Sequence, residues 1–243
     1  MTANPPLGAL LNGLCYYADC WGFSARVERD SDAVFRDLQG LHEYLATSIS
    51  IRASEPDCPR PFLHSDSLFL VAHLTPDLGR NEAIVDATLQ LVEKVTAEAY
   101  RRDLPLRGSF GFGSLAARDS CLVGTAVVNA VRLADTFRAP LSILARHTLQ
   151  CGVSLGVLSD RMVGIGHAGG VEPRMRLTIN CGTKDGGFVL GQPVLYGERS
   201  IQVAEEWLQR TRDANLQSAA PVSAVAGVLA EMASMLANWK SLQ

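Results

Sequence analysis

Apolar positions along the chain recur with two different periods, and the change from one period to the other predicts the order of the elements. Runs of continuous or alternating apolar residues predict strands roughly from Leu10 to Asp19, on both sides of a tight turn at His64–Ser67, and in LPLRGSFGFGSL. Between these strands, spacings of three and four predict helices over Asp30–Ser50, about Leu78–Arg102 and GTAVVNAVRLADTF. In the first of these helices the predicted core-facing side chains are Val34, Phe35, Leu38, Leu41 and Leu45.

The remaining third of the pattern is less regular. PLSILAR is either a further strand or the start of a helix, and the glycine-rich stretch from Cys151 to about Val194 is expected to form strands with turns. Two C-terminal helices are predicted, from Ser200 to about Asn215 and from Pro221 to about Trp239. The second of these helices, in PVSAVAGVLAEMASMLANW, can pack on the sheet, support a dimer or complete the core.

The order of the elements indicates an α+β protein with helices on one face of an antiparallel-rich sheet, which is the ferredoxin-like arrangement with one extra hairpin. We expect a single domain over residues 1–243, with its core over about 10–195 and a C-terminal helical extension over about 200–240. Folds of this kind support unrelated activities, so the function has to be sought in individual residues.

Composition narrows the classes of function. Hydrophobic residues make up 47% and charged residues 19% of the chain, and the net charge of −3 leaves no basic excess for binding nucleic acid or a membrane surface. No apolar stretch approaches the ~20 residues that span a bilayer, and the N-terminus has no basic leader, so a cytoplasmic location is expected. The six cysteines include no CxxC pair, which argues against disulfides and structural zinc.

Two acidic residues interrupt strands that are otherwise fit for burial. Asp19 ends the first predicted strand, and Asp66 lies in the predicted turn of the hairpin. If the two strands are neighbours, both carboxylates reach the same edge of the sheet, where they suit Mg²⁺ or Mn²⁺ completed by the phosphates of a substrate. Directly after Asp19, the residues Gly22, Phe23 and Ser24 would turn the chain and present backbone N–H groups. The alternative for each acid is an ordinary turn residue or helix cap.

Three segments together resemble the class III nucleotide cyclases. ADCWGFS is similar to their first metal motif, HSDSLFLVA to the second, and LVGTAVVNAVRLAD to the helix that carries an Asn and an Arg. The resemblance covers roughly Leu10 to Ala145. The SDS triplet, the LRG triplet at Leu106–Gly108 and the compact helix after Gly124 look most like the pyrimidine cyclases of the bacterial Pycsar antiphage systems.

The resemblance implies a specific reaction. A nucleotide cyclase of this kind would convert UTP, in preference to CTP, into the 3′,5′-cyclic nucleotide and pyrophosphate, as a second messenger for a companion effector in antiviral defence. Two divalent ions, Mn²⁺ or Mg²⁺, would be held by Asp19, Asp66 and the backbone carbonyl of Cys20. Arg132 matches the arginine that stabilises the transition state. Asn129 stands one place after Val128, where the family pattern expects its asparagine.

The resemblance also implies that sites form between two subunits, one giving the acids and its partner the arginine, so a head-to-tail homodimer is expected. Counting along the family pattern puts the base-reading positions at Phe62 and Cys121. Phe62 either stacks on a pyrimidine or belongs to the strand core. Arg107 lies among apolar and small residues and must meet either a carboxylate or a phosphate, and the resemblance favours the phosphate. A guanylate cyclase and an inactive cyclase-like module for nucleotide sensing or dimerisation remain as alternatives.

Overall fold

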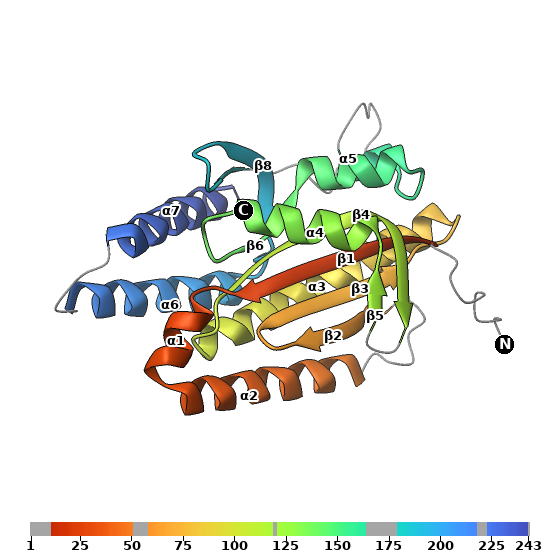
Figure 1. The fold of residues 1–243 in the computed structure, drawn as a ribbon. Helices are drawn as coiled ribbons and strands as arrows, with labels where there is room; N and C mark the ends of the chain where they lie inside the picture. Colours follow the sequence, from red (N-terminus) through yellow and green to blue (C-terminus); the bar gives the residue numbers. More distant parts are fainter. Residues whose placement is uncertain (1–10, 51–57, 119–120, 164–178, 218–222, 243) are drawn as a thin grey trace.

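The computed structural model describes residues 11–50, 58–118, 121–163, 179–217 and 223–242, and its strands join in one eight-stranded sheet (Figure 1). The order across the sheet is β2–β3–β1–β4–β6–β8–β7, and β5 pairs with the end of β4. All these pairings are antiparallel except the one between β4 and β6. The strands are β1 (Leu11–Cys20), β2 (Arg60–His64), β3 (Ser67–His73), β4 (Leu106–Arg118), β5 (Cys121–Val123), β6 (Ser142–Ala145), β7 (Ile179–Gly182) and β8 (Phe188–Pro193).

The α+β class and the antiparallel-rich sheet are confirmed, but the helices cover both faces of the sheet and not one. Side chains of β1 show why, because alternate residues enter different clusters. Leu14 and Tyr16 pack with residues of α3, whereas Cys15, which points to the opposite face, packs with Ala126 and Ala130 of α4. Figure 1 shows α4 in front of the sheet and α3 behind it. The helices are α1 (Phe23–Arg29), α2 (Ser31–Ser50), α3 (Leu78–Arg101), α4 (Thr125–Thr136), α5 (Arg146–Ser154), α6 (Glu198–Gln217) and α7 (Ser223–Lys240).

Helix α4 can lie so close to the sheet because β4 carries glycine at the crossing. A Cβ atom on Gly111 would lie 2.3 Å from the carbonyl oxygen of Ala126 and 2.6 Å from the nitrogen of Ala130. Both of these atoms belong to the backbone of α4, which cannot give way as a flexible side chain could. Glycine in this strand therefore permits the close approach of a helix of the same chain.

The C-terminal helices complete a second part of the core. Trp207 of α6 and Trp239 of α7 are almost fully buried in a cluster with residues of α4, β6 and β7. The indole N–H of Trp239 donates to the carbonyl of Leu195 at 2.8 Å, which satisfies its one buried polar atom. Of the three roles open from the sequence, completion of the core is the one that these contacts show.

Three elements differ from the sequence expectation. Helix α1 has no buried residue, so no apolar period marks it, and β5 is only three residues long. Helix α5 begins at Arg146, in PLSILAR, for which a helix start was one of two alternatives, and it continues into residues from Cys151 on that were expected to be strand and turn. The residues it buries, Thr148, Leu149 and Gly152, include a single large apolar side chain, so no apolar period marks its course. Phe35 of α2, predicted for the core, is 68% exposed. The predicted element starts at Leu10 and Pro221 lie outside the described residues.

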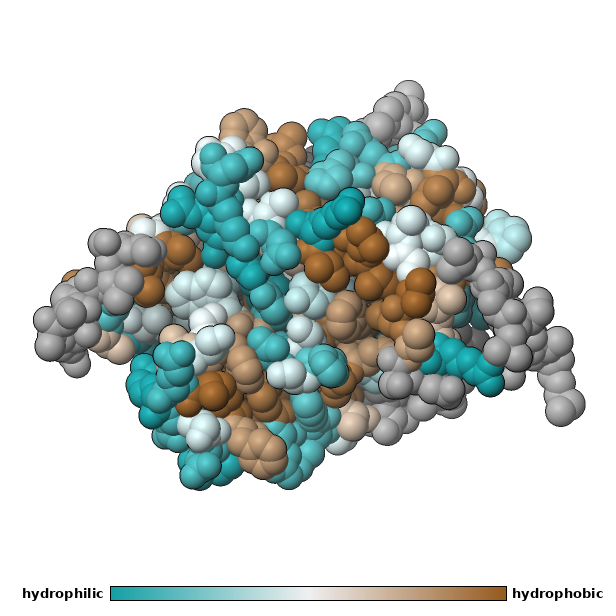
Figure 2. All heavy atoms as spheres, viewed as in Figure 1, coloured by the Kyte–Doolittle hydropathy of each residue, from teal (hydrophilic) through white to brown (hydrophobic). Residues whose placement is uncertain are grey.

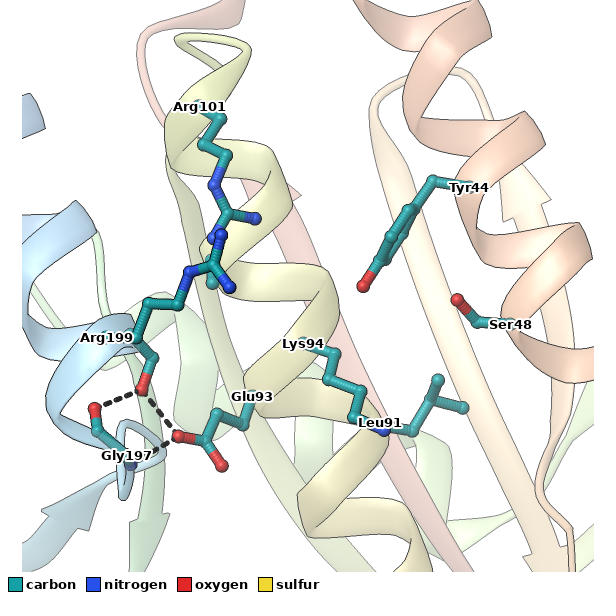
Figure 3. Close-up of a pocket in the computed structure, with 10 residues that line it drawn as sticks. Tyr44, Ser48, Leu91, Glu93, Lys94, Arg101, Gly197 and Arg199 are labelled. Carbon is teal, nitrogen blue, oxygen red and sulfur yellow. Dashed lines mark hydrogen bonds between the residues drawn. The ribbon is translucent and has the colours of Figure 1, made fainter.

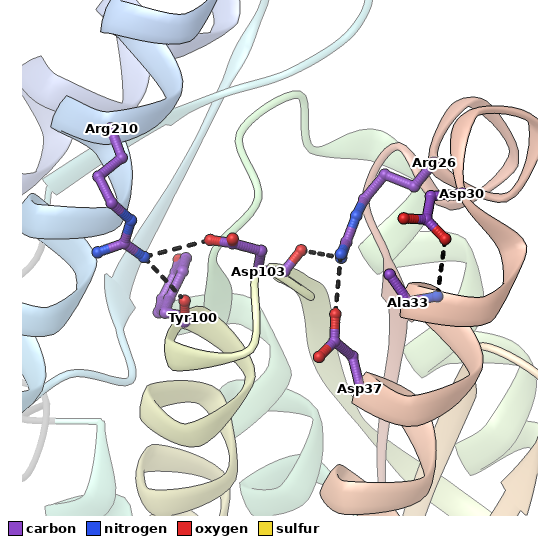
Figure 4. Close-up of polar contacts among 7 residues, drawn as sticks. All are labelled: Arg26, Asp30, Ala33, Asp37, Tyr100, Asp103 and Arg210. Carbon is purple, nitrogen blue, oxygen red and sulfur yellow. Dashed lines mark hydrogen bonds and ion pairs between the residues drawn. The ribbon is translucent and has the colours of Figure 1, made fainter.

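Asp103, in the connection between α3 and β4, ties the helices at one end of the sheet together (Figure 4). Its backbone carbonyl accepts a hydrogen bond from Arg26 of α1, whose guanidinium also pairs with Asp37 of α2 at 3.0 Å. Its carboxylate pairs with Arg210 of α6 at 3.2 Å. The short helix α1, which follows β1 directly, is thus held by these polar contacts together with the packing of Phe23 against the core.

None of the helices in the described part of the chain combines the length and the apolar character needed to cross a bilayer.

Candidate active site

Asp19 and Asp66 lie at the same end of the sheet. Strands β1 and β3 pair with Asp19 opposite Ser67, and Asp66 occupies the turn between β2 and β3 immediately before Ser67. The backbone N–H of Cys20 donates to the carbonyl oxygen of Asp66 at 3.2 Å, which joins the turn to the end of β1. Ser65 adopts a φ of 55°, a left-handed conformation that closes the turn. The strand pairing on which the two-acid hypothesis depends is therefore present.

Asp19 forms a two-pronged ion pair with Arg107, its neighbour across the β1–β4 pairing. The Nε atom of Arg107 lies 3.2 Å from Oδ1 of Asp19, and its Nη2 atom lies 2.6 Å from Oδ2. The fixed fork of a guanidinium matches a carboxylate in this way. Arg107 thus meets a carboxylate, the first of the two partners that the sequence left open, and this carboxylate is the proposed metal ligand itself.

A third acid, which sequence reasoning missed, lies at the same place. Asp135, near the end of α4, has its Oδ1 atom 3.7 Å from Nη2 of Arg107 and 3.9 Å from Nζ of Lys184. Its position in the motif LVGTAVVNAVRLAD, three residues after Arg132, is the sequence signal that could have drawn attention to it.

All three acids affect the pKa of Tyr17. Burial raises the pKa of Tyr17, a hydrogen bond with Ser67 opposes this, and the negative charges of Asp19, Asp135 and Asp66 raise the pKa further. Because an electrostatic effect of this kind falls with distance, all three carboxylates lie within reach of Tyr17, and two of them, Asp19 and Asp135, already lie beside Arg107.

Cys20 is held as a neutral thiol. Burial, with smaller contributions from Asp66 and Asp19, raises the pKa of Cys20 to about 12. A protonated thiol is a poor metal ligand, because the thiolate is the form that binds metals. This leaves the backbone carbonyl of Cys20, and not its sulfur, as the group that could join the two acids.

The donor set fits a hard divalent cation bound together with a substrate. The described residues hold no group of three or more His, Cys, Asp or Glu side chains able to bind a metal alone. Mg²⁺ bound with nucleotides commonly takes only one or two carboxylates and fills its other positions with phosphate and water. Asp66 has no hydrogen bond or ion pair to another described side chain, and a carboxylate has about four lone-pair positions, of which Arg107 uses two on Asp19.

The chain turns at Gly22, shortly after Asp19, and a helix begins there. Gly22 has a φ of 73° and is the N-cap residue of α1, whose first residues are Phe23 and Ser24. This left-handed conformation is one that a glycine adopts without a steric penalty. Contact of these residues with a triphosphate stays a prediction.

Arg132 and Asn129 line a common cavity of about 360 Å³ between β4, α4 and α5. Asn129 donates to the carbonyl of Phe112 at 3.1 Å, and the exposed Arg132 has no ion pair with another described residue. The two side chains are three residues apart and share one side of the helix. Val128, at the family's position for asparagine, is 44% exposed and does not border the cavity.

Helix α5 adds residues to this cavity that sequence reasoning missed, because a helix was only one of two alternatives for its start. His147, Thr148 and Cys151 line it opposite α4. Burial lowers the pKa of His147, so its imidazole is neutral at pH 7. Neither Asp19 nor Asp66 borders this cavity, so within one chain the acids and Arg132 serve separate surfaces.

Phe62 and Cys121, the predicted base-reading positions, lie in different surroundings. Phe62 of β2 is opposite Phe69 of β3 and packs partly against the apolar cluster under α4. The guanidinium of Arg60 lies 5.9 Å from the centre of the Phe62 ring, so one face of the ring already has a cationic partner. Cys121 is exposed at the start of β5, opposite Arg118.

Comparisons with known proteins find solved structures with a similar fold but no similar sequence. No family model matches the chain, and no curated protein matches it significantly. The adenylyl cyclase CyaB from P. aeruginosa is similar at 13% identity, with a TM-score of 0.47, over 78% of this chain and 96% of that one. The guanylate cyclase domain of RhGC from Catenaria anguillulae, in complex with GTP, is similar at 14% identity, with a TM-score of 0.41, over 75% of this chain and 94% of that one. Such values describe a partial likeness of arrangement, so the function has to be argued from the residues of this chain.

Proposed function

We propose that this protein is a nucleotide cyclase that converts a pyrimidine nucleoside triphosphate, UTP in preference to CTP, into its 3′,5′-cyclic nucleotide and pyrophosphate. The observation that carries the proposal is the meeting of Asp19 and Asp66, 47 residues apart in the chain, at one end of the β1–β3 pair, with Cys20 bonded to the turn between them. The motifs around these residues resemble those of class III cyclases, and the comparison structures are adenylyl and guanylyl cyclases.

In the reaction, the ribose 3′-oxygen forms a bond to the α-phosphorus, the bond to the pyrophosphate oxygen breaks, and the 3′-proton is released to solvent. Asp19, Asp66 and the carbonyl of Cys20 would hold Mn²⁺ or Mg²⁺. When bound, these ions would lower the pKa of the 3′-hydroxyl and neutralise the triphosphate. Arg107 orients the Asp19 carboxylate, since it binds both of its oxygens.

Arg132 would stabilise the charge that grows on the α-phosphate, because a guanidinium can contact two phosphate oxygens at once. Asn129, in the same cavity, would orient the ribose. Since this cavity does not border the two acids, the Arg132 that completes a site is proposed to come from a second copy of the chain. Two copies in a head-to-tail pair would give up to two equivalent sites.

The surface over α4 and β5 supports such a pair. Figure 2 shows apolar side chains gathered there, and Val123 and Val128 are 55% and 44% exposed. Tyr17, Phe62 and Phe69 lie on the same face of the sheet and are only partly covered. A continuous apolar surface of this kind marks an interaction site, and a second copy would place its α4 near the acids of the first.

The test is to incubate the purified protein with Mn²⁺ and each of the four ribonucleoside triphosphates, and to assay pyrophosphate and cyclic product. Product from UTP or CTP is expected. No product from any nucleotide would refute the enzyme, product from GTP alone would refute the pyrimidine assignment, and activity that survives Asp66→Ala would refute the metal assignment. The antiviral role and the companion effector rest on the resemblance alone and stay predictions.

One observation favours a second candidate, an inactive cyclase-like module for nucleotide sensing or dimerisation. The ion pair between Arg107 and Asp19 supplies a structural reason for an acid at the end of β1 that needs no metal. In that case no product is expected in the same assay, whereas a separate titration should show that the nucleotide binds.

A further inference from the structure

A cavity of about 560 Å³ lies on the side of the protein away from α4, between α2, α3 and the start of α6 (Figure 3). Its size is that of a small-molecule site. It is bordered by Tyr44, Ser48, Leu91, Glu93, Lys94, Ala97, Arg101, Gly197, Arg199 and Ser200. None of these residues has a part in the proposed cyclase site.

Three exposed cationic side chains border this cavity, and the ammonium of Lys94 is directed away from the two guanidinium groups. Arg101 and Lys94 come from α3, and Arg199 comes from the first turn of α6. Figure 3 shows the guanidinium groups of Arg101 and Arg199 directed toward one another. Arg101 has an ion pair with Glu98 at 3.1 Å, whereas Lys94 and Arg199 have none with a described residue. Cations placed together repel one another unless an anion lies between them.

The acid in the cavity does not supply that anion. Oε1 of Glu93 accepts hydrogen bonds from the backbone N–H groups of Tyr196 and Gly197, at 2.8 and 2.6 Å, and from the hydroxyl of Ser200. These bonds fix the turn before α6, and Figure 3 shows the carboxylate directed to that turn and away from the guanidinium groups. Glu93 therefore shapes the wall of the cavity, and the positive charge remains available.

The other lining groups suit a phosphorylated molecule. Tyr44 directs its hydroxyl into the cavity from α2, with Ser48 one turn further along the helix. Leu91 and Ala97 form an apolar part of the wall, which an organic group attached to a phosphate could cover. Arginine side chains are the preferred partners of phosphate, because their fork contacts two oxygens.

We propose that this cavity binds a small phosphorylated molecule, with its phosphate held by Arg101 and Arg199. The site is separate from the proposed cyclase site, since α3 and α4 pack on opposite faces of the sheet. A ligand there would bridge α2 and α6 across α3. The proposal does not depend on the cyclase activity and can be tested in its absence.

The test is isothermal titration calorimetry with inorganic phosphate, pyrophosphate and ribose 5-phosphate, in EDTA so that no metal supports binding at the two acids. We expect Arg199→Gln and Arg101→Gln each to weaken pyrophosphate binding by at least about tenfold, the effect of losing one charge-assisted contact. The matched control is Arg212→Gln, which removes an exposed charge from the same helix outside the cavity, and it should change binding less than about twofold.

Thermal unfolding of each variant checks that the fold is intact, and Arg101→Gln serves if Arg199→Gln is unstable. Tighter binding of ribose 5-phosphate than of inorganic phosphate would identify a phosphate ester as the ligand, and equal binding would identify the free ion. Absence of binding for all three probes at about 10 mM, which is weaker than ordinary ligand affinities, would overturn the proposal. Equal binding by the wild type and both cavity variants would overturn it as well.

Discussion

Substitution of Asp19 and substitution of Asp66 should have different effects on stability, although both should lower the cyclase activity. The structure gives Asp19 a structural partner in Arg107 and gives Asp66 none among the described side chains. We therefore expect Asp19→Asn to lower both the stability and the cyclase activity, and Asp66→Asn to abolish activity with the fold unchanged. The comparison tests the geometry of the site even if the substrate is other than the one proposed.

The magnitude follows from the ion pair. The Arg107 and Asp19 side chains are 14% and 21% exposed, so the pair is neither fully buried nor free in water. Hydrogen bonds to charged groups contribute about 1.5–3 kcal/mol, and we take the lower half of that range because solvent still reaches the pair. For a chain of 243 residues, about 2–4 °C per kcal/mol then gives a fall in Tm of roughly 3–8 °C for Asp19→Asn. Asp66→Asn should stay within about 2 °C, as for a surface change of ±0.5 kcal/mol.

The assay is thermal unfolding without metal, followed by pyrophosphate release from UTP with Mn²⁺. Glu28→Gln, an exposed acid on α1, is the control and should change neither value. If Asp66→Asn lowers Tm as far as Asp19→Asn, then Asp66 has a structural partner and the reasoning is wrong. If both variants retain more than about a tenth of the activity, the loss is smaller than the removal of a metal ligand should cause.

Three further changes test the packing, the shared site and the neutral thiol. Gly111→Ala should cost about 1–3 kcal/mol in urea unfolding, since its Cβ would lie 2.3 Å from the backbone of α4, and an unchanged midpoint would contradict that packing. Mixing inactive Arg132→Ala and Asp66→Ala should restore up to about a quarter of the activity if sites are shared, and no recovery would count against the dimer. The pKa of Cys20 is raised from 9.0 to about 12, so its contribution to stability is complete below pH 9 and is lost as the pH rises to 12. Cys20→Ala should accordingly flatten the pH dependence of Tm in this range, and iodoacetamide at pH 8 should modify the exposed Cys121 well before Cys20, as peptide mass spectrometry would show.

The parts of the site that follow from local pattern were predictable. A tight turn at His64–Ser67 fixes the register of β2 and β3, and the continuous apolar run of β1 makes it a central strand. Once β1 and β3 are neighbours, the acids at their ends must meet. The same local signals do not say which helix covers which face, and the prediction that all helices lie on one face was wrong for that reason.

The parts that depend on distant segments were not predictable. Arg107 is 88 residues from Asp19, and only the register of β1 with β4 places them opposite one another. Asp135 joins them because α4 crosses the sheet at Gly111, which a spacing in the sequence cannot show. The polar α5, with Thr148 and Gly152 among its buried residues, lacked the apolar period that marks a helix.

Because Asp19 pairs with Arg107, Asp66 says more about the function of the site than Asp19 does. A carboxylate held by Arg107 can be explained by stability alone, and it can equally bind a metal with its remaining lone pairs. Asp19 therefore does not distinguish an active cyclase from an inactive module. Asp66 does, because Arg107 and Lys184 pair with Asp19 and Asp135 and not with Asp66, so no ion pair among the described residues gives Asp66 a structural role at this end of the sheet.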